Sequence, residues 1–238
     1  MKLRAAAYLL RIPEFERPQH TQRHDTIMAD ARVDAKVVLI GDAAVGKTSL
    51  VVRFLHDRFD TTLPTVGASY ATKQVTLPSG QPFALGIWDT AGQERFDALS
   101  SFYCRDARAA VVCFDLTDRA SFDSLKERWL DKVANEAEKN CILCLVGTKS
   151  DLVGTNFLRA VSRDEVAAFA KARGAHTFEC SARDNTCVDT TGGGTTAGLD
   201  AIFQHIASGL GARLTRHTQD DDGTVRVGAT RKEGGCCG

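Results

Sequence analysis

A loop framed by two glycines constrains the fold of this chain more than any other feature. The apolar run at residues 36–40 leads directly into residues 41–48, which read Gly-Asp-Ala-Ala-Val-Gly-Lys-Thr. This is the spacing G-x-x-x-x-G-K-[ST], placed where a strand would end and a helix begin. Glycines let backbone N–H groups converge on an anion, and the following helix adds its positive end. The segment predicts a phosphate-binding loop in which Lys47 reaches the β and γ phosphates and Thr48 ligates Mg²⁺; the alternative is a plain strand-to-helix turn.

Short apolar runs alternate with longer stretches of helical spacing along the chain, which is typical of an α/β sheet built from crossover units. A Pro-Ser-Gly-Gln turn between two of the apolar runs predicts a hairpin. A Ser-x-x-Glu capping box begins one helix at Ser162, and Gly174 ends it. We expect strands at residues 36–40, 69–77, 83–88, 109–116, 141–147 and 177–180, and helices at residues 47–58, 121–138, 162–173 and 199–210.

Composition excludes two classes of function. The 238 residues include 30 Lys plus Arg and 30 Asp plus Glu, so the chain has no basic excess with which to bind nucleic acid. The apolar fraction of 43% is sufficient for one ordinary domain. No apolar run approaches the ~20 residues that a membrane-spanning helix needs, and we expect none.

The two ends of the chain differ from the middle. Residues 1–34 lack hydrophobic periodicity and predict a disordered arm, and both Met1 and Met28 stay open as the start of translation. Residues 35–213 predict the folded domain, with a Gly/Thr-rich insertion at about 189–198 that is expected to be a loop. Residues 214–238 are polar and Gly-rich, which predicts a disordered tail.

The eight cysteines do not predict a secreted disulfide scaffold, because such a protein is a short chain behind a signal peptide. Cys113, Cys141 and Cys144 lie inside apolar runs, where we expect them in the core. Cys141 and Cys144 have the spacing of half a zinc site, but no second pair at ligand spacing accompanies them. Cys236 and Cys237 are adjacent near the C-terminus, in a segment that cannot form a core.

A second motif, Trp-Asp-Thr-Ala-Gly-Gln-Glu at residues 88–94, follows the third predicted strand. Asp89 is placed to hold Mg²⁺ through water, and Gly92 can offer its N–H to a γ-phosphate. Gln93 can orient an attacking water. In phosphoryl transfer the protein mainly positions groups and stabilises charge, so a neutral amide beside the water is a suitable catalytic group.

Together the two motifs resemble those of the small GTPases of the Ras superfamily. Residues 66–70, 86–92, 94–96 and 102–105 resemble segments of its Rab branch, and the likeness extends over about residues 36–210. The resemblance implies an α/β fold, a P-loop small G domain with a six-stranded, mostly parallel sheet and about five helices. It also implies that Thr65 closes on Mg²⁺ and the γ-phosphate, and that Phe59 packs beside guanine.

Base selection is expected from Thr-Lys-Ser-Asp at residues 148–151 and Ser-Ala-Arg at residues 181–183. Asp151 can accept hydrogen bonds from N1–H and the 2-amino group of guanine, which adenine lacks, so ATP is excluded. The Lys149 stem would cover the ring, and the Ala182 N–H would meet O6. The expected nucleotide-binding residues are Gly41, Asp42, Ala43, Ala44, Val45, Gly46, Lys47, Thr48, Ser49, Phe59, Thr65, Gly92, Thr148, Lys149, Asp151, Ser181, Ala182 and Arg183. Among the site residues, Lys47, Gly92 and Gln93 are expected to be catalytic, and Thr48, Thr65 and, through water, Asp89 to hold the metal.

The chain departs from the family where Thr148 replaces the usual asparagine, as it does in atypical Rabs. A hydroxyl cannot make both hydrogen bonds of a carboxamide, and a net loss of ~1 kcal/mol would weaken nucleotide binding roughly fivefold. Gln93 is intact, so we expect hydrolysis. The methyl group of Ala43 would crowd the water or a group supplied in trans, and Ala44 is a further small departure; the stretch between Phe59 and Thr65 is about one residue shorter than in many Rabs. These features affect rate.

The pair Cys236 and Cys237 resembles the C-terminal cysteines that Rabs carry for geranylgeranylation, and two chains anchor stably where one does not. The resemblance implies a GTP/GDP switch in vesicle trafficking, on the cytoplasmic face of an endomembrane and cycling with the cytosol. Its implied partners are an exchange factor, an activating protein, a dissociation inhibitor, an escort protein and effectors. The alternatives are a guanine-nucleotide module that hardly hydrolyses GTP and an ATP-dependent P-loop kinase or motor.

Overall fold

The computed structural model describes residues 33–60, 62–92, 97–155, 157–192, 194 and 196–221. The expected arm up to residue 32, Gln93, and the paired cysteines Cys236 and Cys237 lie outside these residues. The description of side chains also omits residues 97–100 and 214–221.

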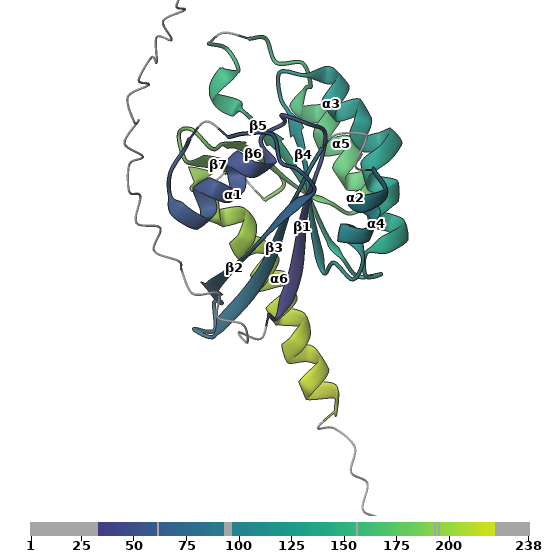
Figure 1. Cartoon of the computed structure of the whole chain (residues 1–238). Coiled ribbons are helices and arrows are strands. Elements are labelled where there is room, and N and C mark those ends of the chain that lie inside the picture. The colour runs from purple at the N-terminus through teal and green to yellow at the C-terminus, as the bar shows by residue number, and fades with distance from the viewer. Residues whose placement is uncertain are drawn as a thin grey trace, which may run out of the picture. The chain divides into compact units, whose positions relative to one another are not determined.

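A single mixed sheet forms the centre of the described residues (Figure 1). Its strands are β1 (Ala35–Ile40), β2 (Ala68–Thr76), β3 (Pro82–Thr90), β4 (Ala109–Asp115), β5 (Ile142–Thr148), β6 (His176–Ser181), β7 (Thr186–Asp189) and β8 (Thr196–Ala197). Their order is β2-β3-β1-β4-β5-β6-β7-β8. Strands β3, β1, β4, β5 and β6 are parallel, whereas β2, β7 and β8 run antiparallel to their neighbours. The α/β class and the mostly parallel sheet are therefore confirmed.

The prediction of six strands is wrong, because the described residues form eight. Strands β7 and β8 arise in and beside the Gly/Thr-rich insertion, which was expected to be a loop. Threonine favours strands, and polar side chains fix this segment to β6. Thr177 Oγ1 lies 2.6 Å from Thr190 Oγ1 and 2.8 Å from Thr191 Oγ1, and His176 Nε2 lies 2.9 Å from Asp189 Oδ1.

Helices cover both faces of the sheet (Figure 1). They are α1 (Lys47–His56), α2 (Asp97–Cys104), α3 (Arg119–Ser124), the π-helical turn η2 (Leu125–Trp129), α4 (Leu130–Glu136), the 3₁₀ turn η3 (Ser150–Leu152), α5 (Arg163–Arg173) and α6 (Asp200–Asp221). Helices α1 and α6 pack on one face, where Val37 and Leu39 point; α3, η2, α4 and α5 pack on the other, where Val38 and Ile40 point. This alternation along β1 is the period-two pattern of a strand buried on both faces.

Helix boundaries follow the predicted signals at α5 and differ elsewhere. Ser162 caps α5 by accepting a hydrogen bond of 3.2 Å from the Glu165 N–H, and Gly174 ends it with a φ of 62°. Helix α6 was expected to stop at residue 210, and the disordered tail to begin at 214, but the helix continues to Asp221. Helix α2 and the π turn η2 were not predicted from the sequence. No helix within the described ranges combines the length and apolar character needed to cross a bilayer.

The cysteines expected in the core are there. Cys113 and Cys144 are fully buried, and the half-buried Cys141 packs against the same apolar cluster as α4 and α5. Burial raises the pKa of the Cys113 thiol to about 12, so this thiol stays protonated at neutral pH. No group of three or more His, Cys, Asp or Glu suited to a metal occurs in the described part of the chain. A disulfide that the sequence analysis did not predict joins Cys180 to Cys187, which face each other across β6 and β7.

Candidate functional site

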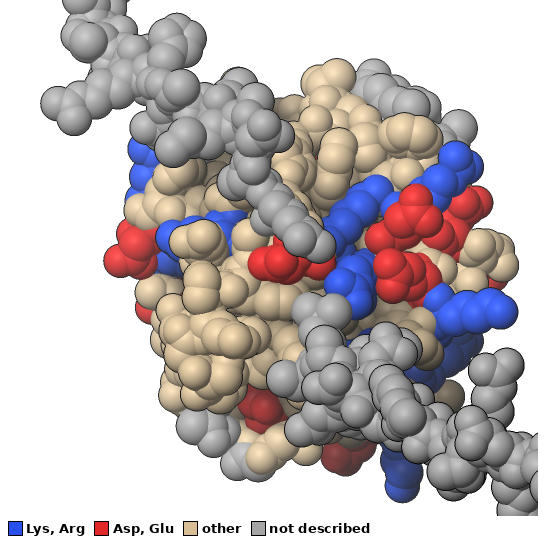
Figure 2. All heavy atoms as spheres, turned by 90° about the horizontal axis from the view of Figure 1, so that it is seen from below, with Lys and Arg blue, Asp and Glu red and all other residues tan. Residues whose placement is uncertain are grey.

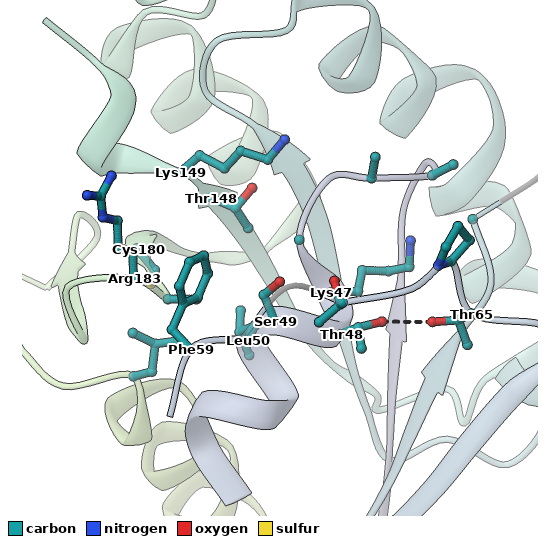
Figure 3. Close-up of a pocket in the computed structure, with 18 of the residues that line it drawn as sticks. Lys47, Thr48, Ser49, Leu50, Phe59, Thr65, Thr148, Lys149, Cys180 and Arg183 are labelled. Atoms are coloured by element: carbon teal, nitrogen blue, oxygen red, sulfur yellow. Dashed lines mark hydrogen bonds between the residues drawn. The ribbon is translucent and has the colours of Figure 1, made fainter. Parts of the chain in front are cut away.

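A cavity of about 580 Å³ lies where the parallel strands end (Figure 3). This edge is the usual ligand site of an open α/β sheet, because the loops that follow neighbouring strands meet there. Figure 3 shows Lys47, Thr48 and Thr65 toward one end, and Phe59, Lys149 and Arg183 toward the other. The predicted site residues that line the cavity are Ala43, Ala44, Gly46, Lys47, Thr48, Ser49, Phe59, Thr65, Gly92, Thr148, Lys149, Asp151, Ala182 and Arg183.

Five predicted residues do not line the cavity but support those that do. They are Gly41, Asp42, Val45, Asp89 and Ser181. Other lining residues were not predicted, namely Leu50, Thr62, Leu63, Pro64, Thr90, Leu152, Cys180 and Leu199. Most of these lie next to a motif in the sequence, so proximity to a motif was the available signal. Leu199 comes from beyond the insertion, and only the fold brings it to the site.

The loop between β1 and α1 adopts the backbone that its glycines permit. Gly41 has a φ of 139°, and a Cβ there would overlap the carbonyl of Cys113 on β4. Gly46 has a φ of 99° directly before α1. Lys47 is only 5% exposed, and its ammonium group donates to the carbonyls of Gly41 at 2.8 Å and Asp42 at 2.6 Å. The lysine therefore lies folded across the loop, and burial lowers its pKa below the ordinary value.

Two hydroxyl groups and a carboxylate gather beside this lysine. Thr48 Oγ1 lies 2.8 Å from Thr65 Oγ1 and donates to Asp89 Oδ2 at 2.7 Å. Asp89 is 1% exposed, and its Oδ1 has no hydrogen-bond partner among the described residues. Burial raises the pKa of Asp89 above its usual range despite the bond from Thr48. An unpaired buried carboxylate oxygen beside two hydroxyls is a donor set that fits a hard cation such as Mg²⁺.

The other end of the cavity carries the residues expected to select the base. Ser181 donates to Asp151 Oδ1 at 2.7 Å and accepts from the Asp184 N–H at 3.0 Å, which fixes the direction of the Asp151 carboxylate. Lys149 Nζ lies 2.7 Å from Asp115 Oδ2. Burial alone would raise the pKa of Asp115, but the hydrogen bond with Lys149 and those from Thr117 hold it below the usual range. Ser181 is therefore a supporting residue here, and Asp151 lines the cavity.

Arg53 supports the site through contacts that were not predicted from the sequence. From α1 it donates through Nε to the Ala182 carbonyl at 2.8 Å and through a terminal nitrogen to the Arg183 carbonyl at 2.9 Å. These bonds join the helix of the phosphate loop to the loop that follows β6. No motif contains Arg53, and its only sequence signal is its place one turn after Ser49 on α1.

Thr148 connects the two ends of the cavity. Its hydroxyl lies 2.5 Å from the Val45 carbonyl of the phosphate loop and 2.9 Å from the Phe114 carbonyl at the end of β4. A hydroxyl has a single hydrogen to donate, so it can fully satisfy one of these two carbonyls at a time. An asparagine amide has two.

Comparison with known proteins identifies the family. A model described as the Ras family matches residues 36–192, from β1 to β7 and the start of the insertion. The chain belongs to the Ras family. "Ras-related protein Rab-24" of Dictyostelium discoideum is 35% identical over 216 residues, covering 88% of this chain and 100% of that protein. "Ras-related protein RABA4d" of Arabidopsis thaliana is 37% identical over 215 residues, covering 85% and 92%.

Membership of this family and the two Rab relatives make the chain a Rab-type small GTPase, an enzyme that hydrolyses GTP. The family match includes the phosphate loop, the segment of Asp89 and Gly92, and the base motif. It ends before β8 and α6, so these elements belong to the described domain but lie outside the matched region.

Proposed function

We propose that this Rab-type GTPase is a membrane-anchored switch that binds GTP or GDP with Mg²⁺, hydrolyses GTP and recruits effectors in endomembrane trafficking. The observation that carries the proposal is the juxtaposition in one cavity of Lys47, the cluster of Thr48, Thr65 and Asp89, and the carboxylate of Asp151. Lys47 and the cluster suit a triphosphate with its metal ion, and the Asp151 carboxylate suits a guanine base. The charge balance gives no reason to add nucleic acid to the partners.

In this proposal Thr48 and Thr65 hold Mg²⁺ directly, and Asp89 holds it through a water. When bound, the metal neutralises charge on the β and γ phosphate oxygens. The unpaired Oδ1 of Asp89 supports this assignment, because a buried carboxylate oxygen needs a partner. The contact between Thr65 and Thr48 also supports the role of a switch. Thr65 lies on the connection between α1 and β2, and its contact with Thr48 ties this connection to the proposed metal site.

Catalysis is assigned to Lys47, Gly92 and Gln93. Lys47 neutralises phosphate charge, the Gly92 N–H binds the γ-phosphate, and Gln93 orients the attacking water. The closeness of Gly92 to the phosphate loop supports this role, because a Cβ there would overlap the Asp42–Ala43 peptide. Any side chain at position 92 would push the two loops apart.

Guanine is proposed to lie between Phe59 and Lys149, with Asp151 on its N1–H and 2-amino group and the Ala182 N–H on O6. Ser181 positions Asp151, and Arg183 closes the rim. Adenine would leave the Asp151 carboxylate unpaired, so the site rejects ATP and with it the kinase or motor alternative.

Effector recruitment is proposed at exposed apolar side chains next to the two loops that sense the γ-phosphate. Leu63 is 85% exposed and Val66 is 76% exposed, both beside Thr65, and Tyr70 and Phe102 are about half exposed. Exposed apolar side chains in such a group are a usual mark of a protein interface. The proposed partners are effectors, an exchange factor, an activating protein, a dissociation inhibitor and an escort protein.

Membrane attachment is proposed through geranylgeranyl chains on Cys236 and Cys237, at the cytoplasmic face of an endomembrane and in exchange with the cytosol. Residues 222–238 would then act as a spacer beyond α6. On the face shown in Figure 2, Lys and Arg side chains lie among Asp and Glu side chains. A mixed face of this kind offers little attraction to anionic lipid, so lipid chains and partner proteins would determine the membrane.

The anchoring proposal predicts that prenylated protein sediments with liposomes and that the double variant Cys236→Ser, Cys237→Ser stays in the supernatant. Each single variant should sediment weakly and reversibly, because one chain gives marginal binding. Cys141→Ser is the matched thiol control and should sediment like the parent. Equal sedimentation of the double variant would refute anchoring at these cysteines.

The enzymatic proposal predicts that one equivalent of bound GTP is hydrolysed in the presence of Mg²⁺, and that EDTA stops the reaction. ATP should be neither retained nor hydrolysed. Gln93→Leu should slow single-turnover hydrolysis about 100-fold, since a misplaced water costs about that much, while GTP binding is unchanged. If the parent is no faster than this variant, even with a Rab-type activating protein, the alternative of a nucleotide-binding module with little hydrolysis is favoured. Ala43 lines the cavity, so Ala43→Gly would then test whether its methyl group slows hydrolysis.

Thr148 provides a graded test of the base motif. Thr148→Asn should slow GDP release about fivefold, because its amide can donate to the Val45 and Phe114 carbonyls together. Thr148→Val keeps the shape, removes the hydroxyl and should speed release by a similar factor. Release of a fluorescent GDP analogue measures all three proteins, and identical rates would show that Thr148 does not weaken nucleotide binding.

A further inference from the structure

The long helix that follows β4 contains a π turn for which the sequence gives no local cause. Residues 119–136 include neither proline nor glycine, yet η2 interrupts the α-helical hydrogen bonds between α3 and α4. A single π turn adds a residue and rotates the side chains that follow, and such turns are frequent at functional sites. The residue at the end of this turn is Trp129.

Trp129 connects this helix to the phosphate loop. Its side chain is fully buried, and its indole Nε1–H donates to Asp42 Oδ1 at 2.8 Å. A nitrogen of the Arg128 guanidinium lies 3.7 Å from the same oxygen, and the guanidinium carbon lies 4.4 Å from the centre of the Trp129 ring. The Asp42 carboxylate is thus held by a neutral donor of fixed direction, with a cation beside it. A hydrogen bond to a charged group is among the stronger ones.

Asp42 contacts two other residues of the proposed phosphate site. Its carbonyl accepts the 2.6 Å hydrogen bond from Lys47, and its peptide lies against Gly92. A movement of Asp42 would therefore move the lysine and the glycine that are proposed to bind the β and γ phosphates. Trp129 itself does not line the cavity.

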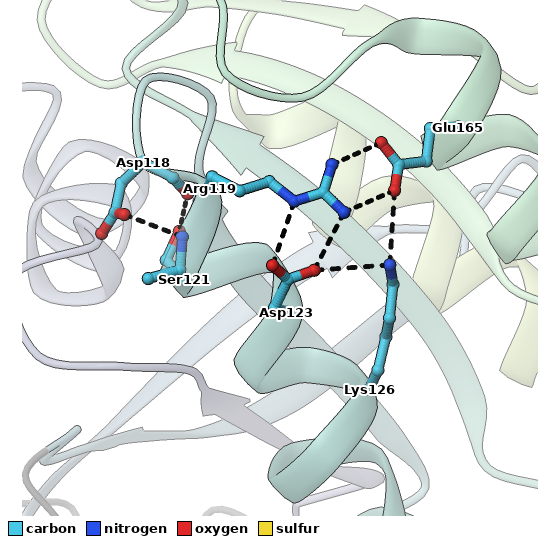
Figure 4. Close-up of polar contacts among 7 residues, drawn as sticks. Asp118, Arg119, Ser121, Asp123, Lys126 and Glu165 are labelled. Atoms are coloured by element: carbon cyan, nitrogen blue, oxygen red, sulfur yellow. Dashed lines mark hydrogen bonds and ion pairs between the residues drawn. The ribbon is translucent and has the colours of Figure 1, made fainter.

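The helix that carries Trp129 is fixed at its other end, so it can act as a support (Figure 4). Arg119, at the start of α3, bonds to both oxygens of Glu165 on α5, at 2.7 and 2.8 Å, and to both oxygens of Asp123 at 3.0 Å. Lys126 lies within 3.5 Å of the same two carboxylates. These exposed ion pairs add little stability individually, but together they set the position of α3 against α5.

We infer that Trp129 is a positioning residue of the phosphate loop: through the hydrogen bond to Asp42 it holds the loop in the conformation that binds the nucleotide phosphates. The π turn exists in this chain to aim the indole N–H at that carboxylate. This inference rests on the proposed nucleotide site and adds to it a residue that touches no ligand.

The test compares release of a fluorescent GDP analogue from the full chain and its variants. Trp129→Phe keeps an aromatic ring but removes the N–H, and it should speed release about tenfold. Asp42→Ala removes the acceptor and should speed release by a similar factor. In the Asp42→Ala background, Trp129→Phe should have no further effect, because the bond is already absent. Phe122→Leu is the matched core control, since Phe122 is fully buried on the same helix and contacts Phe114 and Phe169; it should lower thermal stability and leave release within twofold of the parent.

Three results would overturn the inference and leave the proposed nucleotide site standing. Release from Trp129→Phe at the parent rate would show that the hydrogen bond positions nothing. Effects of the two variants that multiply would show that Trp129 acts by packing alone, and an equal acceleration in Phe122→Leu would show the same. A parent protein that retains no GDP in Mg²⁺ would instead refute the proposed nucleotide site, and the inference with it.

Discussion

Asp151→Asn should lower the affinity of this protein for GTP and GDP by about a thousandfold or more. In the proposed site the Asp151 carboxylate accepts from two donors on guanine, and an asparagine would present a donor where one of these acceptors stood, leaving buried polar groups unpaired. The substitution keeps the fold of the site, because an asparagine oxygen can still accept the 2.7 Å hydrogen bond from Ser181. Titration calorimetry or displacement of a fluorescent nucleotide measures the loss.

A change of base provides the control for this prediction. Xanthine carries an oxygen in place of the 2-amino group of guanine, so the asparagine amide can donate to it, and xanthosine diphosphate should bind the variant better than GDP does. Asp184→Asn is the matched substitution, since Asp184 is exposed and contributes its backbone N–H to Ser181. It should leave GDP affinity within twofold. An Asp151→Asn protein that retains GDP as the parent does would show that Asp151 does not read the base.

The chemical groups of the site could be predicted from the sequence better than the contacts that hold them, because the motifs occur where predicted strands end. Asp89 lies near the carboxyl end of β3, and Asp151 follows the end of β5. Lys47 and Thr48 begin α1, after the loop that follows β1. Loops that follow parallel strands meet at one edge of the sheet, so the meeting of these residues follows from the α/β class. The motif spacing predicts which groups contact the ligand. It does not identify which residues hold those groups in place.

The supporting residues escaped prediction because their roles depend on contacts between distant segments. Arg53 is separated from its acceptor Ala182 by 129 residues, and Trp129 is separated from Asp42 by 87. Neither residue type nor local spacing distinguishes them from ordinary surface or core residues. The π turn could not be predicted for the same reason, since residues 125–129 contain no proline or glycine, and the hydrogen bond proposed to set its register joins it to the distant Asp42.

The insertion was predicted only in part, for a different reason: residues 190–192 form a turn, but Asp189 belongs to β7 and Thr196–Ala197 form β8. The Gly- and Thr-rich composition indicated a loop, but composition does not show which strand a segment can pair with. The edge of β6 offered unpaired backbone groups, and β7 and then β8 occupy that edge by antiparallel pairing. The Thr177 hydroxyl on β6 then lies within hydrogen-bond distance of the hydroxyls of Thr190 and Thr191. The sheet edge and these side-chain contacts together therefore explain the strands, and neither is visible in the composition.

Lys47→Met should lower GTP and GDP affinity about a thousandfold while the protein stays folded. Lys47 is 5% exposed and lies across the phosphate loop on the carbonyls of Gly41 and Asp42, from which it can turn to the β and γ phosphates. Two hydrogen bonds between charged groups contribute about 4 kcal/mol, which is about a thousandfold in affinity. Methionine has nearly the length of lysine and fills the same buried channel, so the loss should reflect the missing charge rather than a cavity.

The number of phosphates separates this effect from a general distortion of the site. Because Lys47 is placed to reach the β and γ phosphates, GMP, which has neither, should bind Lys47→Met nearly as it binds the parent. Lys139→Ala removes an exposed cation just after α4 and should alter neither affinity. If Lys47→Met loses GMP and GDP to the same degree, the lysine supports the shape of the loop, and its assigned contact with the terminal phosphates is wrong. If GDP alone is lost, the charge of Lys47 acts where the phosphate loop predicts, at the end of the cavity away from Asp151.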